Sequence, residues 1–117
     1  MITGLSSSIS ALIAFGKKMA VTANNVANLQ SEGFKKSRAL LEEGSHGGVA
    51  AQIETVNTPG VIMTEEDEQG TVEIELSNVD LEKEIPETLL TQRGYQANLR
   101  TIETEDEMLG FLLDMKG

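Results

Sequence analysis

The fold is decided by residues 4–28, which read GLSSSISALIAFGKKMAVTANNVAN. Small and apolar side chains recur here in alternating steps of three and four, which is the heptad pattern of an amphipathic or coiled-coil helix. This seam consists of Ile2, Leu5, Ile9, Leu12, Gly16, Met19, Ala23 and Val26. The asparagines at its end compete for backbone hydrogen bonds and favour a helix end. We therefore expect a helix from about Gly4 to about Asn28, followed by a turn with positive φ at Gly33.

A second and longer seam lies at the other end of the chain. The same spacing holds for nine steps from about Asp80 to about Met115. Its members are Leu81, Ile85, Thr88, Gln92, Tyr95, Leu99, Ile102, Asp106, Leu109 and Leu113. Near its end the apolar residues surround the whole helix, a pattern that is normally buried by neighbours. Pro86 removes one backbone donor, so we expect a kink or a separate first turn there.

The segment between the two seams predicts a small β-rich insert. Alternating apolar and polar residues, bounded by glycine and proline, are typical of short strands. The expected strands are Val49–Val56, Val61–Thr64 and Thr71–Leu76, with an acidic turn over Glu65–Gly70. For Lys35–Glu43 the pattern leaves a short strand and a helical turn equally open.

The predicted fold class is therefore mainly α with a small β insert. Two long terminal helices form a coiled-coil-like antiparallel pair, and a short three-stranded β element connects them. The expected divisions are an N-terminal assembly helix and asparagine-rich loop over 1–43, an acidic β insert over 44–76, and a C-terminal assembly helix over 77–117. Such seams more often form an intramolecular core, but one seam with alanine and glycine gives two helices little to bury. Assembly with other chains is the physical expectation.

Composition limits the function further. The chain has 117 residues, no cysteine, four aromatic residues and a formal net charge of -10. Residues 1–40 carry five bases and one acid, whereas residues 41–80 carry ten acids and no base. The acidic balance disfavours nucleic-acid binding, and the apolar runs are too short for insertion into a membrane. The opposite charges of the two segments favour their meeting, either within one chain or between neighbours.

No pattern for catalysis is present in the sequence. His46 stands alone in a glycine-rich joint, and the acidic run Glu65–Glu68 lacks the ligand spacing of a calcium loop. Phosphate-binding loops and nucleophile motifs are also missing. We therefore expect no enzyme, no catalytic residue, no cofactor, no metal site and no small-molecule substrate.

Four motifs identify a family resemblance. Residues 23–28 (ANNVAN) are followed by residues 33–34 (GF), residues 77–81 read SNVDL, and residues 91–98 read TQRGYQAN. In this order, and at opposite ends of the chain, they resemble the terminal motifs of bacterial flagellar basal-body rod and hook proteins. The short chain is most similar to a short proximal rod protein of the class C kind. Gly94 stands where the family usually has alanine.

The resemblance implies a structural subunit of the flagellar basal-body rod that supports flagellum-dependent motility. Its terminal helices are implied to self-assemble and to co-assemble with other rod and hook–basal-body proteins as an inner coiled-coil tube, with the insert facing outward. Export through the flagellar type III apparatus, without a cleaved signal, is implied as well. The alternative is a small acidic helical adaptor or export chaperone of the same secretion system.

The expected assembly interface combines the two seams with the family motifs. The asparagine cluster by itself indicates a plain helix end, but with the C-terminal motif present we favour a packing role in which Asn24, Asn25 and Asn28 bond to backbone groups at a crowded junction. The interface residues are Ile9, Leu12, Gly16, Met19, Ala23, Asn24, Asn25, Val26, Asn28, Phe34, Gln92, Arg93, Tyr95, Asn98, Leu99, Ile102, Met108, Leu109, Leu112 and Leu113.

Overall fold

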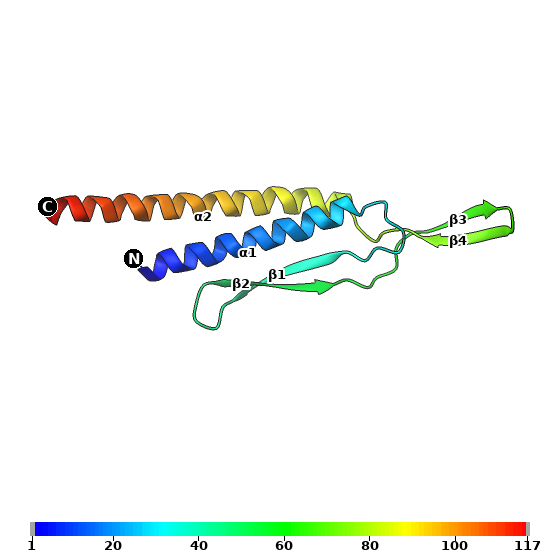
Figure 1. Ribbon diagram of the computed structural model, residues 1–117, viewed down its shortest axis with the longest axis horizontal. Helices are drawn as coiled ribbons and strands as arrows, with labels where there is room; N and C mark the ends of the chain where they lie inside the picture. The colour runs from blue at the N-terminus through cyan, green and yellow to red at the C-terminus, as the bar shows by residue number, and fades with distance from the viewer. Residues whose placement is uncertain (1, 117) are drawn as a thin grey trace.

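The computed structural model describes residues 2–116, and the side chains of residues 4–115. Met1, Gly117 and the side chain of the seam residue Ile2 therefore lie outside the described part. The molecule is elongated, with extents of 82 × 25 × 17 Å (Figure 1). Its elements, in chain order, are α1 (Ile2–Ala27), β1 (Ser37–Glu43), β2 (Val49–Thr55), β3 (Ile62–Asp67), β4 (Gly70–Glu75) and α2 (Leu81–Lys116). The predicted class, mainly helical with a small β insert, is confirmed.

The two helices lie side by side and run in opposite directions (Figure 1). Facing residues show this, because numbers rise along α1 as they fall along α2. The facing pairs are Gly4 with Glu105, Phe15 with Gly94, and Lys18 with Glu87. Helix α2 is the longer one and extends past the start of α1. At 1.5 Å of rise per residue, residues 107–116 overhang α1 by about 15 Å.

The insert holds four strands in two separate two-stranded antiparallel sheets, so the predicted single three-stranded element is wrong. All three expected strands form, and β1 is added from the segment that the sequence left open. Strand β1 pairs with β2 from Ser37↔Thr55 to Glu43↔Val49. The physical reason is backbone hydrogen bonding. Strands β3 and β4 pair with each other, so β2 needs another strand as its partner, and β1 supplies it. The expected division between residues 43 and 44 falls inside the β1–β2 hairpin.

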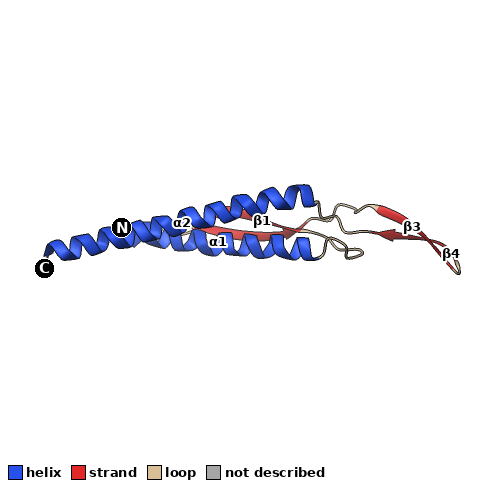
Figure 2. Ribbon diagram, turned by 90° about the horizontal axis from the view of Figure 1, so that it is seen from above, coloured by secondary structure: helices blue, strands red, loops and turns tan. Residues whose placement is uncertain are grey.

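Helix α1 packs against both α2 and the β1–β2 hairpin and lies between them in Figure 1, whereas Figure 2 views the same arrangement from above. The backbone N–H of Val49 donates a hydrogen bond of 3.0 Å to Ser10 Oγ, which fixes the hairpin to the helix. Because α1 is covered on two sides, small side chains fill both contacts. Its buried residues are Ser8, Ala11, Ala14, Thr22 and Asn25. In the described part of the chain, only Ala39 and Val79 join the two alanines as buried hydrophobic residues.

The β3–β4 hairpin projects away from the helices along the long axis (Figure 1). Within residues 2–116 these two strands contact no other element. Their apolar residues stay in solvent, and Val72 is 46% exposed. The acidic turn is shorter than expected, because Glu65–Asp67 belong to β3. An isolated hairpin of this kind is marginally stable, so its base needs the anchors described below.

Helix α2 continues unbroken through Pro86, so the separate first turn expected there is wrong. The missing N–H of Pro86 would have bonded to the carbonyl of Glu82, four residues earlier. Glu82 is exposed, so water can satisfy that carbonyl instead. The positive φ expected at Gly33 is confirmed, with a value of 68°.

Candidate assembly surface and the junction that holds it

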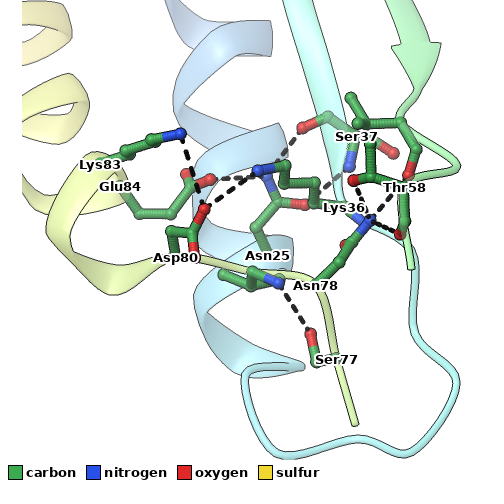
Figure 3. A network of polar contacts seen from close by, with 11 residues as sticks. Asn25, Lys36, Ser37, Thr58, Ser77, Asn78, Asp80, Lys83 and Glu84 are labelled. Carbon is green, nitrogen blue, oxygen red and sulfur yellow. Dashed lines mark hydrogen bonds and ion pairs between the residues drawn. The ribbon is translucent and has the colours of Figure 1, made fainter. Parts of the chain in front are cut away.

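Asn25 joins three elements at the end of α1 (Figure 3). Its side chain is 1% exposed, and its Nδ2 donates to the carbonyl oxygen of Ser37 at 2.7 Å and to Oε1 of Glu84 at 3.3 Å. Its Oδ1 accepts the backbone N–H of Ser37 at 2.9 Å. One amide therefore satisfies both backbone groups at the start of β1 and also holds α2. The packing interpretation of the asparagine cluster applies to this residue.

Asn78, which precedes α2, is the counterpart of Asn25 on the other side of the junction (Figure 3). Its Oδ1 accepts the backbone N–H of Lys36 at 2.6 Å. Its Nδ2 donates to the carbonyl oxygens of Val56 at 2.8 Å and Thr58 at 2.9 Å. The two buried asparagines thus bind adjacent residues of one strand entrance. We call Asn25, Asn78, Glu84 and the backbone of residues 36–37 the asparagine junction.

Charged groups surround the asparagine junction. Asp80 Oδ2 lies 3.4 Å from Lys36 Nζ and 3.7 Å from Lys83 Nζ. Burial raises the pKa of the Glu84 carboxyl above its ordinary value, although the hydrogen bond from Asn25 and the charge of Lys36 lower it. Burial therefore disfavours the charged form of Glu84 in the folded chain.

At the base of the β3–β4 hairpin, the pKa of a carboxyl group shifts in the opposite direction. Glu75 forms an ion pair with Lys35 and accepts the backbone N–H of Gly60 at 3.0 Å. The hydrogen bond from Lys35, followed by that from Gly60, lowers the pKa of the Glu75 carboxyl. These contacts anchor the projecting hairpin to the junction, while most of its length stays in solvent.

The ring of Phe15 in α1 lies against Gly94 in α2. A Cβ atom on residue 94 would lie 2.8 Å from Cζ and 2.9 Å from Cε1 of the Phe15 ring. Even a methyl group would collide with the ring. This explains why the chain has glycine at a position where the family usually has alanine. Gly16 is the reverse case, because a Cβ atom there would meet nothing within 4 Å. Of these two glycines, only Gly94 therefore lies against a side chain of the other helix.

The two predicted seams lie next to each other on one open face of the helix pair. A groove of about 710 Å³ is lined by Leu5, Ile9, Leu99, Ile102, Glu103, Glu105, Asp106 and Leu109. A second groove of about 480 Å³ is lined by Phe15, Gly16, Met19, Gln92, Tyr95, Gln96 and Leu99. Leu99 belongs to both, so they form one apolar surface, which we call the seam face. Several of its large side chains are exposed, including Ile9 at 45% and Leu99 at 45%, and others, such as Leu5 and Ile102, are half-buried.

The seam face continues into the overhang of α2, residues 107–116. Six large apolar side chains there are between 48% and 71% exposed. They are Met108, Leu109, Phe111, Leu112, Leu113 and Met115. Soluble chains rarely leave so large a contiguous apolar surface open unless another molecule covers it.

The twenty predicted interface residues separate into groups in the structure. The seam face contains Ile9, Gly16, Met19, Gln92, Tyr95, Leu99, Ile102 and Leu109, and the overhang contains Met108, Leu112 and Leu113 as well as Leu109. Asn25 lies in the asparagine junction, away from both. The remaining predicted residues line neither surface, and they are Leu12, Ala23, Asn24, Val26, Asn28, Phe34, Arg93 and Asn98.

Two of the predicted asparagines make local bonds. Asn28 Nδ2 donates to the carbonyl oxygen of Asn24 at 2.9 Å, one turn earlier, which closes the end of α1. Asn98 Nδ2 donates to the carbonyl oxygen of Gly94 at 2.8 Å within α2. Their polar groups are therefore occupied within the chain.

Sequence reasoning missed several residues that the structure makes important. The sequence marks Asn78 only as part of the SNVDL motif, and Glu84 carries no signal that distinguishes it from other surface acids. Phe15 falls between the predicted seam positions. Its contact could be inferred only by asking why Gly94 replaces alanine in the family motif.

The described residues contain no group of His, Cys, Asp and Glu placed to hold a metal ion. His46 is exposed in the turn between β1 and β2. Neither described helix combines the length and the hydrophobicity that crossing a bilayer requires.

The fold, the seam face and the overhang together define a class of protein. In this class a helix pair carries a β insert and leaves an apolar face open. Family comparisons identify the class. The family model described as "Flagellar basal body rod FlgEFG protein C-terminal" matches residues 68–115. The one described as "Flagella basal body rod protein" matches residues 5–35.

Individual proteins agree with these matches. The flagellar hook protein FlgE of Treponema pallidum is 32% identical over 97 residues, covering 80% of this chain and 20% of that protein. FlgE of Borreliella burgdorferi is 31% identical over 131 residues, covering 95% of this chain and 30% of the relative. The flagellar basal-body rod protein FlgG of Bacillus subtilis is 46% identical over 43 residues, covering 37% of this chain and 16% of the relative. The chain belongs to the flagellar basal-body rod and hook protein family, and it spans less than a third of each of these relatives.

Proposed function

We propose that this chain is a non-enzymatic structural subunit of the bacterial flagellar basal-body rod. It assembles with copies of itself and with other rod and hook proteins through its terminal helices, in the axial structure that supports motility. The observation that carries the proposal is the seam face. The two segments that the rod family models match provide the residues of one open apolar surface.

The distribution of burial supports an assembly role. The polar asparagine junction is closed within the chain, whereas the overhang leaves side chains such as Phe111, at 67%, in solvent. Burying a large apolar side chain stabilises by roughly 1.5–3 kcal/mol, so neighbours that cover this surface contribute much of the stability that the alanine-rich core lacks. The antiparallel coiled-coil-like pair then acts as the unit that packs against neighbouring pairs.

The proposal includes a location and a route. We place the chain in the basal body, among the axial proteins of the flagellum, with other flagellar structural proteins as its partners. It reaches that position through the flagellar type III export apparatus. The proposal involves no nucleic acid, small-molecule substrate or membrane insertion.

Localisation of a tagged copy tests this proposal. The tagged full chain should co-purify with basal bodies, and deletion of its gene should abolish motility. Versions that lack residues 1–30 or 100–117 should still be made but should not restore motility, because each loses part of the seam face. If either truncated chain restored motility, the rod assignment would be wrong. A stable, compact dimer in gel filtration that never reaches the basal body would instead favour an adaptor or export chaperone.

A further inference from the structure

The outer face of α1 is basic and free of other elements. Exposed residues follow one another along it in steps of four, three and four: Ile13, Lys17, Ala20 and Asn24. Helix α1 contains no acidic residue. Its neighbouring lysine, Lys18, pairs with Glu87 at 3.0 Å, whereas Lys17 makes no ion pair with any described residue. This face therefore offers one exposed isoleucine, a small residue, an asparagine and one uncompensated positive charge.

The distal part of α2 has the complementary character. Four acids stand within five positions, at Glu103, Glu105, Asp106 and Glu107. None of them makes an ion pair in the described part of the chain, and the start of α1 beside them supplies no base. Glu103 and Asp106 border the wider groove of the seam face, beside Leu99, Ile102 and Leu109.

These opposite surfaces cannot meet within one molecule. Lys17 is adjacent to Lys18, whose partner Glu87 precedes Glu103 by sixteen residues. That separation corresponds to about 24 Å along α2. The two helices are held in this register by Phe15 against Gly94, so only another copy can bring the charges together.

We propose that the outer face of α1 in one copy docks on the distal seam face and overhang of α2 in the next copy, with Lys17 between Glu103 and Asp106. Ile13 of the first copy then covers Leu109 of the next copy. The docked α1 thus takes the place beside the overhang that the next copy's own α1 leaves empty. This inference rests on the proposed assembly function and names the two surfaces that meet. Because the surfaces differ, the contact is heterologous and repeats from copy to copy, as a filament requires.

Cysteine crosslinking tests the contact directly, since the chain has no native cysteine. We would introduce Ile13→Cys and Leu109→Cys together and oxidise the assembled protein. Phe15 faces Gly94, so residue 13 lies level with about residue 96 of the antiparallel helix, thirteen residues before Leu109. The two new thiols therefore lie about 20 Å apart along the axis within one chain. A disulfide needs Cα atoms within about 7 Å. A ladder of covalent oligomers is therefore expected only from contacts between copies.

The matched control is Ile13→Cys with Val61→Cys. Val61 is 69% exposed but lies at the base of the β3–β4 hairpin, outside the proposed contact. It should give no ladder. A ladder of equal strength from this control, or none from the Ile13–Leu109 pair, would overturn the proposed contact.

Charge reversal gives a second, independent measurement. Lys17→Glu and Asp106→Lys should each weaken self-association by about tenfold, because each places like charges opposite one another. Mixing the two variants should restore association, since the reversed charges again attract across one interface. The control Lys83→Glu changes the net charge as Lys17→Glu does, at a side chain 76% exposed near the junction. It should leave association unchanged, and failure of the mixture to recover would count against the pairing.

The outcomes separate this inference from the proposed function. If the tagged wild-type chain co-purifies with basal bodies but the Ile13–Leu109 pair gives no ladder there, the contact is wrong and the rod function stands. If the ladder forms in solution but the tagged chain never reaches basal bodies, the contact stands and the rod function is wrong.

Discussion

The two ends of the helix pair differ in which kind of side chain is buried. At the asparagine junction, polar side chains are buried, with Asn25 at 1% and Asn78 at 8% exposure. At the distal end, apolar side chains are exposed, with Leu113 at 62% and Met115 at 71%. A buried amide is tolerated only when its hydrogen bonds are made, and at the junction they are made within the chain. The apolar side chains at the exposed helix end are not buried by contacts within the described part of the chain.

This contrast shows which part of the molecule is complete alone and which part depends on others. The junction fixes where β1 starts and how α1 meets α2, so it sets the frame. The frame holds the two predicted seams on one face and leaves the overhang beyond α1. Changes at the junction should therefore alter folding, whereas changes at the distal end should alter association.

The largest effect is expected from Asn25→Ala. The change removes the side-chain partner of the part-buried backbone N–H and carbonyl of Ser37, and it removes the buried hydrogen bond to Glu84. Each unsatisfied buried group costs about 1–3 kcal/mol, so we expect a loss of about 3 kcal/mol in the free energy of unfolding. Urea denaturation followed by circular dichroism measures it.

Asn28→Ala is the matched control for this change. Asn28 bonds only to residues of its own helix end and the following turn, so its loss should cost about 1 kcal/mol or less. Equal destabilisation by the two substitutions would show that Asn25 is an ordinary helix end and would remove the basis of the comparison.

A smaller effect of either sign is expected from adding one methyl group to α1 or α2. Gly94→Ala forces a Cβ atom against the Phe15 ring, and overpacking costs about 1–3 kcal/mol against a gain of about 1 kcal/mol in helix propensity. We expect a net loss of about 1 kcal/mol. Gly16→Ala meets open space and should stabilise by about 1 kcal/mol. Thermal unfolding of both variants compares the same chemical change at two sites.

The background Phe15→Leu sharpens this test. A shorter side chain removes the clash, so Gly94→Ala should become neutral or stabilising in that background, as a double-mutant cycle would reveal. If Gly94→Ala destabilised equally with Phe15 and with Leu, the ring would not be the cause, and the register of the helix pair would depend on other contacts.

The sequence predicts the helices and the expected strands well because local patterns govern both. The seams at Leu5–Val26 and Leu81–Leu113 follow helix periodicity, and the three expected strands follow alternation. The fourth strand, β1, depends on pairing with β2, which no local pattern in Lys35–Glu43 contains. The contact of Phe15 with Gly94 also depends on tertiary register. Gly16 lies in a seam yet faces open space, whereas Gly94 outside the seam receives Phe15.

The candidate site could be predicted only in part for a related reason. Periodicity identifies which residues share a helix face, so Ile9, Leu99 and Ile102 are correctly grouped. It does not say whether that face meets the partner helix or remains open. In the structure small residues such as Ala11 and Ala14 make the internal contacts of α1, and the larger seam residues are left outside.

The smallest effect is expected from Glu84→Gln, and it depends on pH. Burial raises the pKa of Glu84 in the fold, so the folded chain holds this proton more tightly than the unfolded chain. Wild-type stability from this group is therefore greatest below the unfolded pKa and is lost as pH rises through the raised folded pKa. Glutamine does not titrate and can still accept from Asn25. Relative to wild type, the variant should thus gain stability as pH rises, as urea titrations at several pH values would show.

Glu75→Gln is the control of opposite sign. Its ion pair with Lys35 lowers the pKa of Glu75, so its stability is present above the unfolded pKa and lost as pH falls through the folded one. Relative to wild type, Glu75→Gln should therefore lose stability as pH rises, while Glu84→Gln gains it. The charges that face Glu84 are those of Lys36, Glu87 and Asp80, and both variants keep them. If the two curves ran in the same direction, burial of Glu84 would not control its protonation, and the junction would be open to water rather than closed within the chain.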